Sequence, residues 1–215
     1  MPPHGDLARC RGVNHGGAMT PPAVLDPEQV IFALAAAAEA KDAYTEGHAR
    51  WVASTARHLG TRLGLQESDL SALYRGGLVH DIGKIGVPDA ILLKLGPLNA
   101  EEERRMRAHP VIGENMVKPV PSAADVLTII RHHHERFDGG GYPDGLPGHK
   151  IPLLARIVSV CDAYDALASD RPYRSRRDSQ ETMETLMRGA GQQWDRELVS
   201  LLLSELPAIR FEVAS

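Results

Sequence analysis

Apolar residues in most of this chain recur at intervals of three and four, the spacing that places them on one face of a helix. Two such stripes are formed by Val52, Ala56, Leu59 and Leu63, and by Leu70, Leu73, Gly77 and Leu78. Residues 153–168 predict a long apolar helix, and residues 179–188 predict an amphipathic one. The alternation with period two that is typical of strands is absent, so the pattern predicts an all-α protein.

Capping residues predict where several helices begin. Asp26 and Pro27 start a helix over residues 26–40, in which Gln29 is placed to complete a capping box. Similar signals stand before later segments, at Asn99 with Glu102, at Ser122 with Asp125, and at Asp195. Residues 1–25 have no periodicity and predict disorder. Loops are predicted for two stretches rich in glycine and proline, residues 86–97 and 137–152.

Composition limits the location and the partners of the protein. The chain has 215 residues, 43% of them hydrophobic, which suffices for the core of one domain. Its net charge of −4 argues against binding to a nucleic-acid polymer or an anionic membrane. No apolar run approaches the roughly 20 residues of a membrane span, and no signal peptide is recognisable. Because Cys10 and Cys161 form neither a disulfide framework nor a zinc pattern, a cytoplasmic location is expected.

Histidine is abundant, with ten residues, and His80 begins the sequence His-Asp-Ile-Gly-Lys. The carboxylate of Asp81 has two oxygens and could bridge two cations while His80 binds one of them. Lys84 would supply positive charge where an anionic substrate binds. Gly83 is expected to adopt the backbone angles of a helix end. The alternative interpretation is a solvated His–Asp pair at the end of a helix.

Other segments offer further metal donors. They are His48, His109, the run His132-His133-His134, and the pair Asp162 and Asp165. The two aspartates face the same way on an otherwise apolar helix, where burial is costly unless they are paired or bind a metal. Asp165 could instead be only a capping or salt-bridging partner. Mixed nitrogen and oxygen donors favour Fe, Mn or Zn over Ca or Mg.

Two irregular stretches suggest contacts with a ligand. Residues 138–145 contain three consecutive glycines followed by Tyr142 and Pro143, which would let the backbone approach a ligand or a metal closely. Residues 171–177 carry four arginines and could bind a phosphate. The corresponding alternatives are a flexible surface connection and a solvated turn.

Together these segments resemble the HD-GYP domain, a branch of the HD phosphohydrolase superfamily. The resemblance rests on His80-Asp81-Ile82-Gly83-Lys84 with Gly141-Tyr142-Pro143, and it extends in the family's order from about residue 41 to residue 205. It is also carried by His48, His109-Pro110, His133-His134-Glu135, Asp162-Ala163-Tyr164-Asp165 and Arg171-Pro172-Tyr173-Arg174. It implies a helical bundle of the HD-domain type over residues 41–210, with a buried dinuclear metal centre.

The resemblance also implies an activity and the residues that perform it. The activity is hydrolysis of cyclic di-GMP to pGpG, with cleavage to GMP in some members, in bacterial second-messenger signalling. Two divalent ions, Fe or Mn, would be bound by His48, His80, Asp81, His109, His133, His134 and Asp162. Asp81 would bridge the ions, with His48, His80 and Asp162 at one and His109, His133 and His134 at the other. Asp81 and Lys84 would be catalytic, and the substrate would contact Lys84, Gly141, Tyr142, Pro143 and Arg171.

The chain departs from the family at a few positions. Tyr44 stands where some members carry a glutamate that binds a third metal, so two metal ions are predicted. Glu46 lies on the opposite face of that helix and does not substitute for the glutamate. Trp51 replaces a usual arginine, and Leu95 replaces a usual loop proline.

Two other functions are compatible with these residues. One is hydrolysis of another nucleotide or cyclic dinucleotide, and the other is a non-catalytic module that binds GGDEF-domain signalling proteins through the Gly-Tyr-Pro loop. The presence of every expected ligand favours an enzyme. The N-terminal helix at residues 26–40 could support a homodimer.

Overall fold

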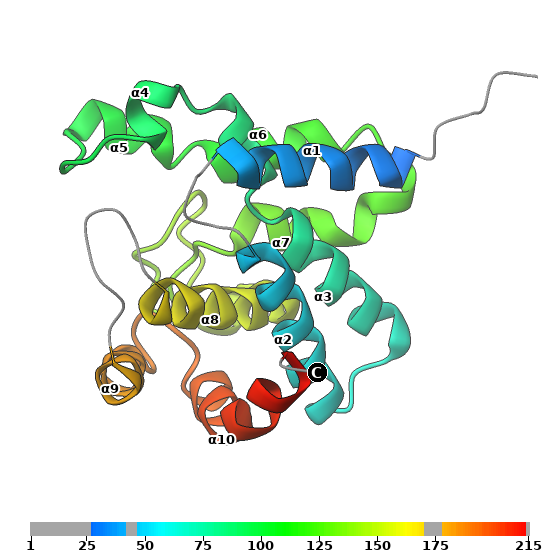
Figure 1. Ribbon diagram of the computed structural model, residues 1–215, viewed down its shortest axis with the longest axis vertical. Coiled ribbons are helices and arrows are strands. Elements are labelled where there is room, and N and C mark those ends of the chain that lie inside the picture. Colours follow the sequence, from blue (N-terminus) through cyan, green and yellow to red (C-terminus); the bar gives the residue numbers. More distant parts are fainter. Residues whose placement is uncertain (1–26, 42–46, 170–177, 214–215) are drawn as a thin grey trace, which may run out of the picture.

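The computed structural model describes residues 27–41, 47–169 and 178–213, in which every regular element is a helix (Figure 1). The elements are α1 Pro27–Lys41, α2 His48–Arg62, α3 Glu67–Val79, η1 Ile82–Gly86, α4 Asp89–Leu92, α5 Ala100–Met106, α6 His109–Val117, η2 Pro121–Val126, α7 Leu127–His132, η3 Gly148–Lys150, α8 Leu153–Ala168, α9 Ser179–Gly189 and α10 Arg196–Val213. The all-α prediction is confirmed. Within the described ranges, no helix has the length and apolar character needed to cross a membrane.

Several element starts agree with the sequence prediction. α8 spans residues 153–168 as expected, and α1 begins at Pro27, although its predicted cap Asp26 lies outside the described residues. The capping box of α5 is formed: Asn99 Oδ1 accepts the N–H of Glu102 at 2.9 Å, and Glu102 Oε2 accepts that of Asn99 at 2.8 Å. These signals act within one helical turn, which explains why the sequence reveals them.

The predicted start of the helix before the histidine run is wrong. Ser122 and Asp125 lie in the 3-10 helix η2, and α7 begins only at Leu127. The Asp125 carboxylate pairs with Arg75 of α3. The Asp125 side chain, which the local pattern predicted to cap a helix, therefore forms an ion pair with a distant helix instead.

Two smaller expectations also need correction. Residues 86–97 are not one loop, because the short helix α4 lies within them. Leu63 does not extend the buried stripe of α2, since that helix ends at Arg62 and Leu63 is exposed. Both differences concern the ends of elements.

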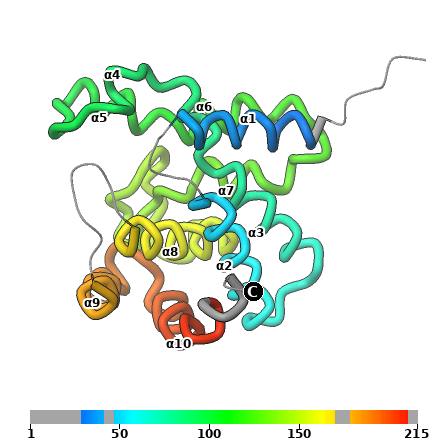
Figure 2. The backbone as a smooth tube through the Cα atoms, in the orientation of Figure 1, coloured from blue at the N-terminus to red at the C-terminus, as the bar shows by residue number. Residues whose placement is uncertain are grey.

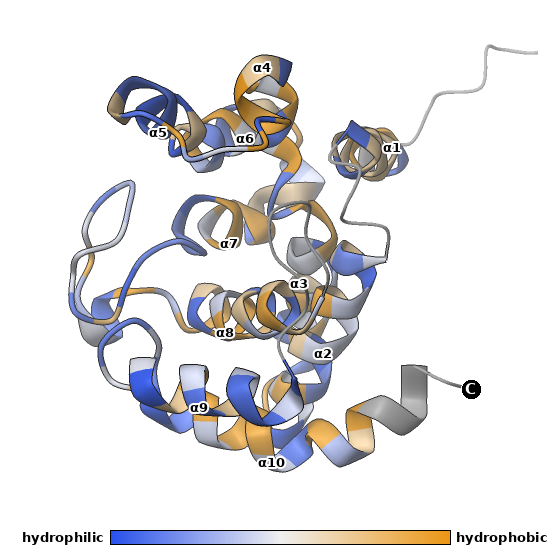
Figure 3. Cartoon of the chain, turned by 60° about the vertical axis from the view of Figure 1, so that its left-hand side comes forward, coloured by the Kyte–Doolittle hydropathy of each residue, from blue (hydrophilic) through white to orange (hydrophobic). Residues whose placement is uncertain are grey.

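Two clusters of buried apolar side chains hold the helices together. The larger joins α2, α3, α8 and α10, and includes Leu59, Leu73, Ile157 and Leu202. The smaller joins α1 to η1, η2, α6 and α7, and includes Ile31, Ile82, Val117 and Val126. Figure 2 shows α9 and α10 on the opposite side of α8 from α1, and Figure 3 shows apolar positions on α7 and α8.

The segments that follow α3 and α7 lie where the two clusters meet. α7 contributes Ile129 to the larger cluster and Ile130 to the smaller one, while the last residue of α3, Val79, belongs to the smaller. His80 and His133 come directly after these helices, and both side chains are buried. The fold therefore directs polar side chains into the region between two apolar cores.

Close packing at two glycines brings the neighbouring elements together. A Cβ on Gly77 of α3 would lie 2.5 Å from Ala53 Cα of α2. A Cβ on Gly83 of η1 would lie 1.9 Å from the carbonyl oxygen of His109 on α6. The expectation that Gly83 adopts unusual backbone angles is wrong, because it is not among the glycines with positive φ. Packing is the reason for a glycine at this position.

Candidate metal centre

Five histidines and two aspartates from separate segments converge on one region of the protein. His48 begins α2, His80 and Asp81 lie between α3 and η1, His109 begins α6, His133 and His134 follow α7, and Asp162 is in α8. They form two groups, His48 with His80 and Asp162, and Asp81 with His109, His133 and His134. Within each group the donor atoms lie within 4.8 Å of one another. The structure thus brings together all seven residues that the family resemblance implied.

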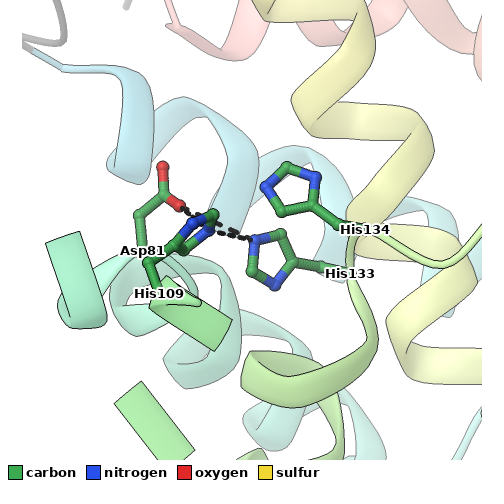
Figure 4. Close-up of side chains that lie close together, drawn as sticks. All are labelled: Asp81, His109, His133 and His134. Carbon is green, nitrogen blue, oxygen red and sulfur yellow. Dashed lines mark hydrogen bonds and ion pairs between the residues drawn. The ribbon is translucent and has the colours of Figure 1, made fainter. Parts of the chain in front are cut away.

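The group around His109 is shown in Figure 4. Asp81 Oδ1 lies 3.1 Å from His109 Nε2 and 3.6 Å from His133 Nε2. The two Nε2 atoms are 3.4 Å apart. The His134 ring lies beside that of His133, with ring centroids 4.1 Å apart. Nitrogen and oxygen atoms of four side chains therefore face one small volume.

Backbone hydrogen bonds determine which imidazole nitrogen faces the centre. The Nδ1–H groups of three rings donate at 2.8–2.9 Å to the carbonyl three residues earlier, in the pairs His80 to Gly77, His109 to Met106 and His133 to Ile130. A carbonyl can only accept, so Nδ1 carries a proton, and in the neutral ring Nε2 carries none. This is the tautomer in which Nε2 can bind a metal.

The second group contains a carboxylate that orients a ring. His48 Nε2 lies 3.3 Å from Asp162 Oδ1, on the inner side of the ring. On the other side, His48 Nδ1 donates to Asp165 Oδ2 at 2.6 Å. The structure therefore shows Asp165 as the salt-bridging partner of His48 and not as a member of the ligand group. Because Asp165 occupies Nδ1, Nε2 is left to face Asp162 and His80.

Asp81 links the two groups through its two oxygens. Oδ1 faces His109 and His133, as described above. Oδ2 lies 3.4 Å from His80 Nε2, and it also lies 2.7 Å from Lys84 Nζ. One carboxylate is therefore shared between both sets of imidazoles, with the Lys84 ammonium at its edge.

The charges around Asp81 favour metal binding. Burial alone would raise the pKa of Asp81, but the Lys84 ammonium and the positive charge of His80 outweigh it and hold the pKa of Asp81 well below its usual value. Burial lowers the pKa of His133 and of His134, so both rings are neutral. An ionised carboxylate beside neutral imidazoles is the protonation state that metal binding requires.

Unsatisfied atoms and excess negative charge show that the residues fit a bound cation. His80 Nε2 and Asp81 Oδ1 are buried and make no hydrogen bond within the described part of the chain. Such atoms are rare in folded proteins. Burial lowers the pKa of His48, yet the carboxylates of Asp162 and Asp165 raise it to about 10. A divalent cation would satisfy the buried atoms and offset the carboxylate charge.

The Gly-Tyr-Pro loop lies against the His109 group. The Tyr142 ring stacks on His134, with centroids 4.9 Å apart, and the Arg107 guanidinium lies 5.2 Å from the Tyr142 ring centroid. Burial raises the pKa of the Tyr142 hydroxyl, so it stays protonated. Gly141 permits this position, because a Cβ there would lie 2.2 Å from the backbone nitrogen of Arg136. Pro143 follows through a cis peptide bond.

Glu135 anchors the far end of the same loop, a role that the sequence analysis did not predict. It is buried, and its two carboxylate oxygens accept the N–H groups of Asp144 at 2.7 Å and Leu146 at 3.0 Å. The alternative of a flexible surface connection for residues 138–145 therefore does not describe this loop. The sequence feature that could have indicated this role is an acidic residue directly after a histidine run and before a glycine-rich stretch.

Of the other residues named in the sequence analysis, Arg171 with its arginine-rich segment, and Tyr44, are outside the described residues. His132 belongs to neither group, and its Nδ1 lies 3.4 Å from Asp144 Oδ2. Trp51, which replaces the family's arginine, stacks on Tyr164 of α8 with ring centroids 5.3 Å apart.

Comparison with known proteins agrees with the family resemblance seen in the sequence. The sequence model of a family described as HD domain matches residues 33–198. The chain is 37% identical over 178 residues to the cyclic di-GMP phosphodiesterase response regulator RpfG of Xanthomonas campestris, a match covering 81% of this chain and 47% of the relative. It is 38% identical over 157 residues to 3'3'-cGAMP-specific phosphodiesterase 1 of Vibrio cholerae, covering 73% of this chain and 36% of that protein. The chain thus spans less than half the length of these relatives.

A solved structure shares the fold. It is that of an HDG"Y"P protein from Bdellovibrio bacteriovorus, which matches with a TM-score of 0.62 at 24% sequence identity. The match covers 74% of this chain and 51% of that one. The helical fold is therefore not peculiar to this sequence.

Proposed function

Since this chain belongs to the HD domain family, and within it to the HD-GYP branch, we propose that it is a metal-dependent phosphodiesterase that hydrolyses cyclic di-GMP to pGpG. The observation that carries this proposal is the sharing of the Asp81 carboxylate between two sets of buried imidazoles. Two relatives that contain this domain are named phosphodiesterases of cyclic dinucleotides. The substrate class follows from those names, and the chemistry follows from the site.

The two groups are proposed to hold two divalent ions. The ligands at the first would be His48, His80 and Asp162, and those at the second His109, His133 and His134, with one Asp81 oxygen at each. This mixture of imidazoles and carboxylates suits Fe or Mn. When bound, such a pair of ions lowers the pKa of a shared water and polarises the phosphodiester.

The protein's own residues would position and stabilise the reacting groups. Lys84 Nζ, 2.7 Å from Asp81 Oδ2, would place positive charge beside the phosphoryl oxygens as negative charge builds up on them. Asp165 would keep the His48 ring in its orientation. Tyr142, with Gly141 and Pro143 on either side of it, would form the wall of the site next to His134. A contact of Arg171 with the substrate stays a prediction.

The test is to load the protein with Fe(II) without oxygen, or with Mn²⁺, and to incubate it with cyclic di-GMP. Chromatography should show pGpG, and GMP would indicate a second cleavage. Absence of product with both metals at high enzyme concentration would contradict the proposal. A parallel assay with 3'3'-cGAMP is required, because a relative specific for that substrate is 38% identical.

Protein partners belong to the same proposal. Binding of a GGDEF-domain protein through the Gly-Tyr-Pro loop and formation of a homodimer stay predictions of the family resemblance. Light scattering of the protein alone, and with a GGDEF domain, measures both.

A further inference from the structure

A pocket of about 360 Å³ opens beside the candidate metal centre. It lies among α8, α9 and the segment before α10, and Figure 3 shows α9 next to α8. Its lining includes His133, His134 and Asp162, so it borders both ligand groups. Sites for small molecules commonly have volumes of about 300–1,000 Å³. A phosphodiester at the centre would therefore have room for one of its attached groups here.

One part of the pocket lining is apolar. The helix α8 contributes Ala163, Ala166 and Leu167, and the segment before α10 contributes the Trp194 indole. Trp194 is held in place by Gly189 at the end of α9, where a Cβ would lie 2.4 Å from the ring. An aromatic surface beside small apolar side chains suits a flat heteroaromatic ring.

Another part of the lining is polar and has hydrogen-bonding capacity to spare. The Ser159 hydroxyl, the Gln193 side-chain amide and the Trp194 indole N–H make no hydrogen bond to other described residues. The backbone at Gln193 is nevertheless held, because its carbonyl accepts the N–H of Phe137 at 3.1 Å. All three side chains can donate, and the Ser159 hydroxyl and the Gln193 amide can also accept. The edge of a purine base presents donors and acceptors that such groups can pair with.

We propose that this pocket receives one guanine base of the cyclic dinucleotide. Trp194 stacks on the ring, and Gln193 and Ser159 bind its edge. This inference rests on the proposed function, since the phosphodiester at the metal centre directs the attached base into the pocket. It makes Gln193 a residue that binds the edge of the base.

Binding can be measured without turnover. The chain has two tryptophans, so Trp51→Phe leaves Trp194 as the single indole. Titration of this variant, loaded with Mn²⁺, with GMP, which has no phosphodiester to cleave, should quench Trp194 fluorescence saturably. Inorganic phosphate, which carries no base, should leave the fluorescence unchanged. No saturable quenching by GMP, or equal quenching by inorganic phosphate, would overturn the proposal.

Kinetics separate the base pocket from the metal centre. Gln193→Leu removes the amide at similar size and should raise KM for cyclic di-GMP about tenfold, as expected for the loss of a hydrogen bond. Hydrolysis of bis(p-nitrophenyl) phosphate, a phosphodiester without a purine, should keep its wild-type rate. Gln192→Leu, one residue away and outside the pocket lining, is the matched control and should change neither.

The outcomes distinguish this inference from the proposed function. An unchanged KM in Gln193→Leu, or equal losses with both substrates, would overturn the role of Gln193. A wild-type protein that cleaves bis(p-nitrophenyl) phosphate but no cyclic dinucleotide would contradict the proposed function. In that case quenching of Trp194 by GMP would still support the base pocket, and its absence would overturn it.

Discussion

Gly83 lies where η1 meets α6, and the absence of a Cβ lets the carbonyl oxygen of His109 approach its backbone. Asp81 and Lys84 are on the same short segment as Gly83, so this contact helps to set their distance from the His109 ring. The 3.1 Å between Asp81 Oδ1 and His109 Nε2 depends on it. At the scale of residues, packing of the backbone determines the geometry of the donors.

Replacing Gly83 with alanine should separate the two elements. The added Cβ would lie 1.9 Å from a backbone oxygen, and we expect a loss of about 3 kcal/mol in unfolding free energy together with reduced metal content. Urea denaturation and metal analysis measure both. The control is Gly96→Ala, where nothing lies within 4 Å of the added carbon. Equal stability of the two variants would contradict this explanation.

Asp165 should act on the metal through His48. Replacing Asp165 with alanine frees His48 Nδ1, and loss of such an orienting partner weakens metal affinity by about 10–100-fold. Titration of metal-free protein should show one weakened ion and one unchanged ion. Asp162→Ala, which removes a proposed ligand of the same ion, should have a larger effect. Loss of both ions in Asp165→Ala would mean that Asp165 does not act through His48 alone.

At the scale of elements, helix ends position the rings. The carbonyls that accept from Nδ1, at Gly77, Met106 and Ile130, all belong to the last turn of a helix, in α3, α5 and α7 respectively. Carbonyls in the last turn have no partner within their own helix. Each imidazole therefore satisfies a helix end while its other nitrogen faces the metal site.

The helix α5 should depend on its cap more than on packing. It has no buried residue, so its capping box contributes a large share of its local stability. Replacing Asn99 with alanine should cost about 1 kcal/mol. Hydrogen exchange should become faster in the first turn of α5, whereas metal content should stay unchanged, because the cap lies at the opposite end of α5 from Met106, whose carbonyl accepts from His109. Loss of metal in this variant would show that α5 must stay folded to position His109.

At the scale of the whole molecule, the candidate centre connects the two apolar clusters. Its donors come from α2, α3–η1, α6, α7 and α8, so bound ions would link segments that are far apart in the sequence. Ligands that bind only the folded state stabilise it by mass action, by about 2.7 kcal/mol when the free ligand concentration is 100 times its Kd.

Removing the metal should therefore lower the melting temperature, and adding Mn²⁺ should restore it. Asp81→Ala should abolish this response, because its carboxylate faces both groups, and it should also remove both ions and the activity. Calorimetry with and without chelator, together with metal analysis, measures these effects. Asp89→Ala, at an exposed carboxylate paired with Lys41, is the control. Normal turnover in Asp81→Ala would refute the bridging role.

The sequence by itself determined the features that depend on near neighbours. The all-α class, the limits of α8 and the capping box at Asn99 follow from residues within a few turns of one another. The identity of the seven candidate ligands followed from motifs whose order along the chain resembles one family. These patterns are local or linear, and a reader of the sequence can see them.

Only the tertiary structure decided the geometry. The pairing of His48 with Asp165 joins residues 117 positions apart, and no local pattern distinguishes Asp165 from Asp162. The contact of Gly83 with His109, the use of Asp125 by Arg75 and the burial of Glu135 are likewise choices between distant partners. Local propensity acts over one or two helical turns, whereas the separation of two donor atoms depends on how whole helices pack.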